Sequence, residues 1–135
     1  MITLPAEIEK AIRSQAQAEM PNECCGYLGG SRSGENVTIA SRYPMTNIDH
    51  SPEHFSFDPA EQFATFKSAR ENGEDLVANY HSHPETPARM SEEDIRLAND
   101  TSVSYFIYSV SDDRLKAFSV DRNRNVTEIP VRITS

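Results

Sequence analysis

Two histidines one residue apart, His81 and His83, are followed at once by Pro84, and this short segment most constrains how the chain can fold. The residues before it predict a strand from Asp75 to Tyr80. Side chains two residues apart on a strand point to the same face. If the strand continues through both histidines, their imidazoles therefore face one point at its end. Pro84 then ends the strand and begins a loop, because a proline has no N–H for the sheet.

The residues that follow bring a carboxylate back toward this point. Residues 84–90 contain two prolines and no apolar periodicity, which predicts a loop. A short helix is expected from Ser91 to about Asn99, with Asp94 in its first turn. Two imidazoles and a carboxylate suit zinc, and three protein ligands leave a position for water, as in catalytic sites. The sequence therefore predicts a metal site with three ligands, His81, His83 and Asp94.

Each part of this pattern can also be explained by a purely structural role, without a metal or catalysis. Ser91 and Asp94 have the spacing of a capping box, in which the serine caps the helix and the acidic residue pairs back. The two histidines can be polar residues at a solvated strand end. Glu23, just before an apolar and glycine-rich segment, can be a solvated turn residue. Beside a metal-activated water, however, a glutamate is the expected general base.

The complete pattern resembles the JAMM motif of the MPN-domain metalloproteases. That motif has a glutamate, then His-x-His-Pro, and then a serine and an aspartate at set spacings. Residues 84–90 separate the second histidine from Ser91, and Asp94 follows three residues later. Every position of the motif is therefore matched in this sequence. Residues 22–30, 44–47 and 55–59 resemble the compact bacterial branch of the family that processes sulfur carriers. The resemblance spans residues 4–120.

The resemblance implies one α/β domain over residues 1–135, an MPN domain with a mixed sheet flanked by helices in a cytidine-deaminase-like arrangement. It also implies a zinc metallopeptidase, with Glu23 as the general base and Ser91 as a hydrogen-bond donor to the oxyanion. The expected reaction is hydrolysis after the C-terminal Gly-Gly of a ubiquitin-like or sulfur-carrier protein. The sequence leaves the natural substrate, the leaving residue, the oligomeric state and the metal used in the cell open.

Three other functions stay open. An Fe(II) oxygenase also uses two histidines and one carboxylate, but it has no need of the base at Glu23 or the donor at Ser91. A catalytically silent MPN scaffold or binding module usually lacks motif residues, and all five are present here. A phage-tail or cell-wall peptidase of the same family would use the same five residues on another substrate.

Composition indicates a soluble globular chain and disfavours some partners. The 135 residues, 37% apolar and 25% charged, suit a single domain. The net charge of −8 argues against nucleic acid as a partner. No apolar run approaches the length that spans a membrane, and no signal peptide is evident. Cys24 and Cys25 are adjacent in the sequence, and adjacent cysteines rarely form a disulfide with each other, so we expect two buried free thiols. Free thiols fit a reducing compartment, and we therefore expect a cytoplasmic location.

Hydrophobic periodicity predicts alternating helices and strands. A helix over residues 5–20 should bury Ile8, Ile12 and Ala16 together with Leu4. A second helix begins after Asp58, ends near residue 72, and should bury Phe63 and Phe66. Strands are expected at residues 25–30 and 36–43 (a hairpin), 55–57, 103–110 (covered on both faces), 115–120 and 126–133 (an edge, because of Pro130).

Three further residues lie near the expected site without a settled role. His50 and His54 fall in a polar loop over residues 46–54, and Arg89 falls in the loop before the serine of the motif. All three suit a solvated surface. They also suit the border of a substrate groove, and Arg89 is the one cation that we consider as a substrate contact.

Overall fold

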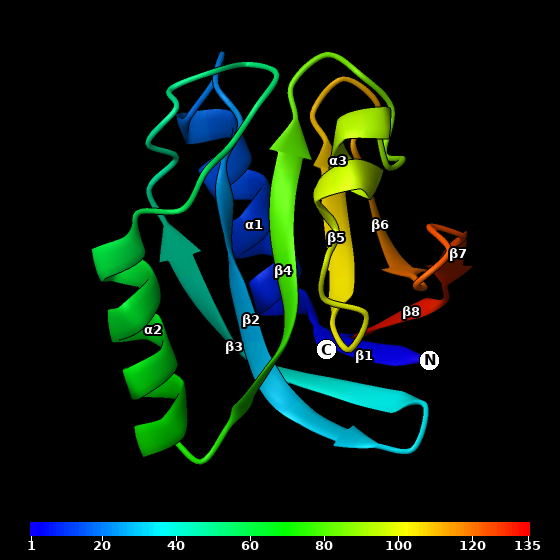
Figure 1. Ribbon diagram of the computed structural model, residues 1–135. Helices are drawn as coiled ribbons and strands as arrows, with labels where there is room; N and C mark the ends of the chain where they lie inside the picture. The colour runs from blue at the N-terminus through cyan, green and yellow to red at the C-terminus, as the bar shows by residue number, and fades with distance from the viewer.

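Strands and helices alternate along the chain, and the computed structural model describes all of residues 1–135 (Figure 1). The strands are β1 (Ile2–Pro5), β2 (Cys25–Ser33), β3 (Asn36–Met45), β4 (Asp75–His83), β5 (Ser104–Ser109), β6 (Arg114–Val120), β7 (Val126–Ile129) and β8 (Val131–Thr134). The helices are α1 (Ala6–Ala18), α2 (Pro59–Glu71) and α3 (Glu92–Leu97). The α/β order predicted from the sequence is confirmed. None of the helices combines the length and apolar character needed to cross a membrane.

All the strands belong to one mixed sheet, in the order β7-β6-β5-β4-β2-β3-β1-β8. The pairs β1–β3, β1–β8 and β4–β5 are parallel, and the other pairs are antiparallel. Only Pro130 separates β7 from β8, although these strands lie at opposite ends of the order. The sheet therefore curls until its two edges meet near Pro130. The single edge strand predicted for residues 126–133 is in fact two edge strands, because the proline interrupts the ladder between them.

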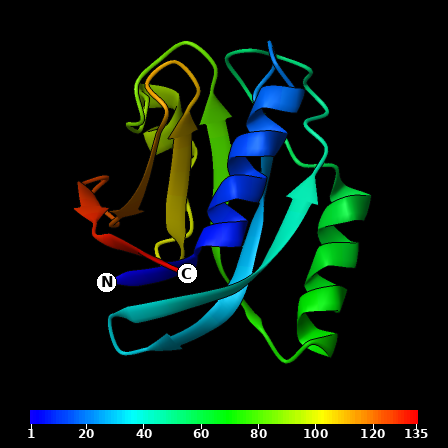
Figure 2. The ribbon, with the colours of Figure 1, turned by 180° about the vertical axis from the view of Figure 1, so that it is seen from behind.

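Helix α1 covers one face of the sheet (Figure 2). Ile8, Ile12 and Ala16 lie about one turn apart along it and are buried in the main apolar core, as predicted. Leu4 is also buried, but in β1 and not on the helix. The sequence did not reveal β1, because its backbone partners come from residues 37–38 and 131–134, far away in the chain.

Helices α2 and α3 lie on the other face. Asp58 caps α2 as predicted, accepting a hydrogen bond from Ala60 N. The prediction that α2 buries Phe63 and Phe66 is wrong, because their side chains are 73% and 50% exposed. The small residues Thr65 and Ala69 face the core instead, so the helix backbone comes close to the sheet and the aromatic rings are left outside.

Strand β5 is buried along its whole length, as predicted for a strand covered on both faces. Phe106 and Tyr108 face the α1 core, and Tyr105 and Ile107 belong to a second, smaller cluster that α3 helps to cover. The expected strand at residues 55–57 is reduced to a single bridge between Asn47 and Phe57. Residues 46–58 are therefore a loop, and this loop lies next to the end of β4.

Candidate metal centre

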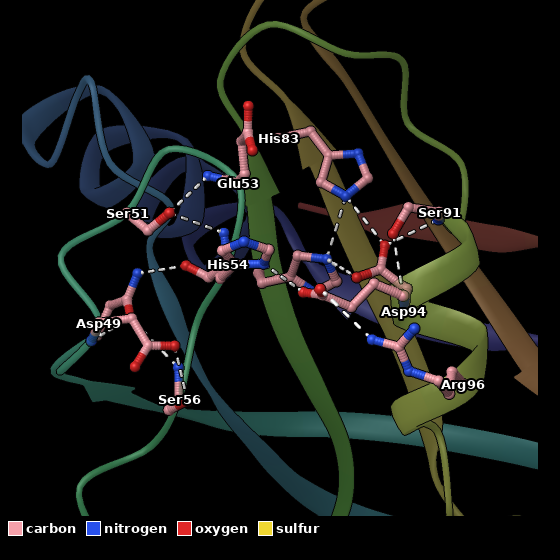
Figure 3. A network of polar contacts seen from close by, with 12 residues as sticks. Asp49, Ser51, Glu53, His54, Ser56, His83, Ser91, Asp94 and Arg96 are labelled. Carbon is pink, nitrogen blue, oxygen red and sulfur yellow. Dashed lines mark hydrogen bonds and ion pairs between the residues drawn. The ribbon is translucent and has the colours of Figure 1, made fainter.

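The structure brings His81, His83 and Asp94 together where β4 ends and α3 begins. Figure 3 shows His83 and Asp94 pointing toward one another. The Nε2 atoms of the two histidines are 3.2 Å apart. Asp94 Oδ1 lies 3.2 Å from His81 Nε2, and Asp94 Oδ2 lies 3.0 Å from His83 Nε2. The three side chains are only 3%, 5% and 11% exposed. The predicted convergence of these three side chains is present in the fold.

Pairing on both sides keeps β4 extended through the two histidines. On one side His81 and His83 pair with Ile107 and Ser109 of β5. On the other side, Ser82 N donates to Cys24 O, and Ser82 Oγ accepts from Cys24 N. Because the strand stays regular, the imidazoles share one face, and the serine between them points to the other.

The orientation of the imidazoles fits a metal ligand set. His83 Nδ1 lies 2.9 Å from the carbonyl oxygen of Pro87, so Nδ1 carries the proton and Nε2 keeps its lone pair for a ligand. The His81 ring is stacked on Phe55, at a centroid distance of 4.6 Å. Ligand atoms 2.0–2.1 Å from a tetrahedral zinc are roughly 3.3 Å apart. The observed spacing of 3.0–3.2 Å is close to this value.

The capping explanation for Ser91 and Asp94 is also correct. Ser91 Oγ accepts from Asp94 N, and Asp94 Oδ2 accepts from Ser91 N, each at 3.0 Å. The cap and the metal site are therefore not alternatives, because the cap turns the carboxylate toward the histidines. Burial raises the pKa of Asp94, but its close contacts with the His81 and His83 imidazoles and the hydrogen bond from Ser91 N outweigh burial and hold the pKa well below its usual range.

Glu23 lies beside this cluster on the neighbouring strand end. Cys25 pairs with His81, and the antiparallel register extended by two residues places Glu23 opposite His83. Its side chain is 4% exposed, so the solvated-turn explanation is wrong. Burial, and then the nearby negative charges of Asp94 and Glu93, raise the pKa of Glu23 to about 9.

Asn47 holds the loop beside Glu23 in place, and apart from the family resemblance of residues 44–47 no sequence pattern predicts this role. The side chain is 3% exposed. Its Nδ2 donates to Glu23 O at 3.0 Å and to His54 O at 2.9 Å. Its Oδ1 accepts from Asp49 N and Ser56 N. The loop that carries Phe55 onto the His81 ring is thus tied to the backbone of Glu23.

A groove of about 460 Å³ leads up to the cluster. Residues of α2, α3, the strands between them and the loop segment 55–57 line it, and His81 and Asp94 are among the lining residues. Tyr27 and Phe57 give it an aromatic wall, with ring centroids 4.6 Å apart. No lysine or arginine lines it. The groove can hold an extended chain that ends at the cluster.

The other residues near the site differ in their surroundings. His54 Nδ1 lies 2.6 Å from Glu93 Oε1 at the rim of the groove, and this contact raises the pKa of His54. His50 and Arg89 are exposed, and neither lines the groove. Cys24 and Cys25 are buried free thiols, as expected. Burial raises the pKa of both thiols, that of Cys24 to about 12, which keeps them protonated and unreactive.

An imidazole–carboxylate cluster next to a buried glutamate has the groups that a metal-dependent hydrolase site uses. Residues 5–122 match the family described as prokaryotic homologs of the JAB domain, and the chain belongs to this family. It is a hydrolase of the JAMM type, in the compact prokaryotic branch of the MPN family. Members of this family generally depend on a metal.

Several named proteins are similar over most of the chain. A CysO-cysteine peptidase from Mycobacterium tuberculosis is 29% identical, over 98% of this chain and 91% of that protein. A desampylase from Haloferax volcanii is 31% identical, over 86% and 85%. A probable TtuB-protein conjugate cleaving protease from Thermus thermophilus is 30% identical, over 93% and 80%.

Solved structures agree with this fold. A solution structure of a protein from Desulfitobacterium hafniense is 42% identical, with a TM-score of 0.91 over 99% of this chain and 93% of that one. A JAB1/MPN domain protein from Archaeoglobus fulgidus shares the fold at 19% identity, with a TM-score of 0.64 over the whole of both chains. The single-domain MPN architecture expected from the resemblance agrees with both.

Proposed function

We propose that this protein is a zinc-dependent peptidase that cuts a peptide or isopeptide bond after the C-terminal Gly-Gly of a ubiquitin-like or sulfur-carrier protein. The observation that carries the proposal is the convergence of His81, His83 and Asp94, with Glu23 buried nearby and a groove that His81 and Asp94 help to line. The relatives act, by their names, on CysO-cysteine and on a TtuB-protein conjugate, which supports a carrier protein as the substrate class.

His81, His83 and Asp94 would hold the zinc. When bound there, zinc would polarise the scissile carbonyl and lower the pKa of a water molecule. The Glu23 carboxylate accepts the proton from the attacking water and then passes it to the nitrogen of the leaving amine. Ser91 Oγ accepts from Asp94 N, so its own hydroxyl proton is available to donate to the developing oxyanion.

The substrate tail is proposed to lie in the groove, not along a sheet edge. Strand β4 has β2 on one side and β5 on the other, so no free strand edge borders the histidines. Glycine suits the last positions of the tail. A Cβ atom on the tail would hinder its close approach to the cluster between Phe55 and α3, which both line the groove. Recognition would then use backbone hydrogen bonds and the shape of the groove.

A matched set of carrier fusions tests the cleavage site. The enzyme should cleave a carrier that ends in Gly-Gly followed by a cysteine and should tolerate other residues after the cut. Replacing the final glycine by valine should reduce kcat/KM by at least about a hundredfold, because the side chain would block the approach. Equal rates for the glycine and valine substrates would instead indicate a general peptidase, such as a phage-tail or cell-wall enzyme.

Metal analysis separates zinc from the Fe(II) alternative, since the same three ligands suit either ion. A catalytically silent scaffold would bind the metal and the carrier without turnover.

A cytoplasmic location is proposed as well, and the two unbridged cysteines support it. Nucleic acid is not proposed as a partner, in view of the net charge of −8. The likeness of the sheet to cytidine deaminases stays a prediction.

A further inference from the structure

Asn79 is a polar side chain on the floor of the groove that the fold leaves without a partner. It belongs to β4, which runs between α2 and α3 (Figure 1), and it lines the groove together with His81. The two residues are two positions apart on the strand, so the Asn79 amide and the His81 imidazole project from the same face. A strand rises by about 3.3 Å per residue, which places Asn79 roughly 6.6 Å along the floor from His81.

Two tyrosines flank Asn79 on this floor. Asn79 pairs with Tyr27 of β2 and with Tyr105 of β5, and both tyrosines also line the groove. Their hydroxyls are engaged, because Tyr27 Oη accepts from Gln62 Nε2 and Tyr105 Oη donates to the carbonyl oxygen of Asp100. The half-buried side-chain amide of Asn79, between the two rings, makes no hydrogen bond within the chain.

Outside the metal cluster, the other polar side chains that line the groove also have partners within the chain. They are Ser56, Gln62, Glu93, Asn99 and Asp100. An asparagine amide offers N–H donors and a carbonyl acceptor next to one another. Asn79 therefore presents an unused donor and an unused acceptor to the occupant of the groove, and a peptide unit has the groups that pair with both.

The spacing between Asn79 and the cluster decides which part of the tail reaches the amide. An extended tail has the same rise per residue as the strand beneath it, so tail residues two apart match the spacing of His81 and Asn79. With the final glycine at the cluster, the residue opposite Asn79 is the one that precedes Gly-Gly. The N–H and C=O of one extended residue point to the same side, so a single amide can pair with both.

We propose that the Asn79 amide binds the backbone of the residue before Gly-Gly, with Oδ1 accepting from its N–H and Nδ2 donating to its carbonyl oxygen. The contact depends on the backbone and not on the side chain, so it selects an extended tail without fixing the residue at that position. This inference rests on the proposed function for the identity of the tail. Asn79 is a binding residue in this arrangement, and its loss should act on KM more than on kcat.

An amide-to-ester exchange in the substrate tests the contact. One substrate is a tail peptide with alanine before Gly-Gly and a cysteine after the cut. In the other, L-lactic acid replaces the alanine, which exchanges the N–H for an oxygen of similar size. For wild type the exchange should raise KM about fivefold, because one hydrogen bond is lost. Asn79→Ala should raise KM for the amide peptide at least as much, and the exchange should then have no further effect.

Three controls separate this contact from a general loss of structure. The same exchange one residue earlier in the tail removes an N–H that points away from the floor, and its effect should be equal in wild type and Asn79→Ala. Asn36→Ala removes an exposed asparagine on β3 and should leave KM for both peptides unchanged. Zinc content and melting temperature should match wild type in both variants.

Equal KM values of the amide and ester peptides for wild type would overturn the proposal, whatever the variant does. An ester effect of the same size in wild type and Asn79→Ala would overturn it as well. NMR titration of the zinc-loaded protein with the same peptides ending at Gly-Gly measures binding without turnover. An ester effect on binding that depends on Asn79, without cleavage, rejects the proposed reaction and keeps the contact, whereas cleavage without that effect does the reverse.

Discussion

The two halves of the site are built in opposite ways. In the cluster half, His83 Nδ1 donates to the Pro87 carbonyl and Ser91 N donates to Asp94 Oδ2. His83 Nε2 and Asp94 Oδ2 are held 3.0 Å apart. In the base half, the Glu23 carboxylate makes no hydrogen bond within the chain, and only its backbone is fixed, by Ser51 and Asn47. Correspondingly, the pKa of Asp94 is held below its usual range, and that of Glu23 is raised to about 9.

This difference suits two separate tasks. A metal ligand has to be ionised and rigid, and the surroundings of Asp94, which favour its charge, suit the ligand role that we propose for it. The base that we propose has to exchange protons, and Glu23, buried near other carboxylates, would bind a proton readily and release it when a cation is close. The comparison predicts that substitutions in the cluster half change metal binding, whereas those in the base half change turnover alone.

The largest effect is expected in the cluster half. His83→Ala should lose both the metal and all measurable activity. It removes one of the three proposed ligands, and His81 and Asp94 are too firmly held to move and replace it. Metal content by mass spectrometry and the rate of carrier cleavage are the measurements. Full zinc occupancy in this variant would show that the ligand assignment is wrong. His50→Ala, which removes an exposed histidine outside the cluster, should keep both.

In the base half, Glu23→Gln should keep the metal and the fold but lose turnover by a factor on the order of 10²–10⁴. The amide fills the same space and cannot accept the proton. Equal metal content with reduced kcat is the expected result. Loss of metal from this variant would make Glu23 a ligand and would remove the distinction between the two halves.

Ser91 lies where the two tasks meet, since it caps α3 and also faces the site. Ser91→Ala should lower kcat on the order of 10²–10³-fold through loss of the oxyanion donor. The lost cap should reduce the free energy of unfolding by about 1 kcal/mol. Ser91→Thr keeps the hydroxyl and should retain more of both. Normal kcat with reduced stability would leave Ser91 with the capping role alone.

Asn47→Ala tests whether the base half depends on its loop. The substitution removes the donors to Glu23 O and His54 O, so kcat should fall by about tenfold while metal content stays the same. The unsatisfied carbonyls should cost about 1–3 kcal/mol of stability. Asn72→Ala, which removes an exposed hydrogen bond to Tyr43 Oη, is the matched control. A kcat equal to that of wild type would separate the loop from the chemistry.

The last expected effect is on stability and not on turnover, and it is a dependence of stability on pH. In the metal-free protein the pKa of Glu23 rises from 4.5 in the unfolded chain to about 9, so the folded state binds more protons between these values. The free energy of unfolding should therefore fall as pH rises through this window. Glu23→Gln should flatten the slope. Asp94, with its lowered pKa, affects stability only at acidic pH. Urea unfolding in the presence of a chelator measures both slopes.

The sequence alone determined the parts of the site that are close in the chain. Alternation places His81 and His83 on one face of β4, and the Ser91–Asp94 spacing makes a helix cap. The cap of α2 at Asp58 and the burial of β5 on both faces followed in the same way. These features depend on local periodicity and on hydrogen bonds between near neighbours, which a sequence pattern records directly.

Only the tertiary structure decided the rest. Strand β1, the exposure of Phe63 and Phe66, and the role of Asn47 all depend on contacts between distant parts of the chain. The backbone of Cys24 next to Glu23, for example, is held by Ser82, 58 residues further on. Burial of Glu23 and Asn47 is set by the curl of the sheet and the fold of the 46–58 loop over its end. Periodicity does not record such contacts, because they arise only once the sheet has closed around them.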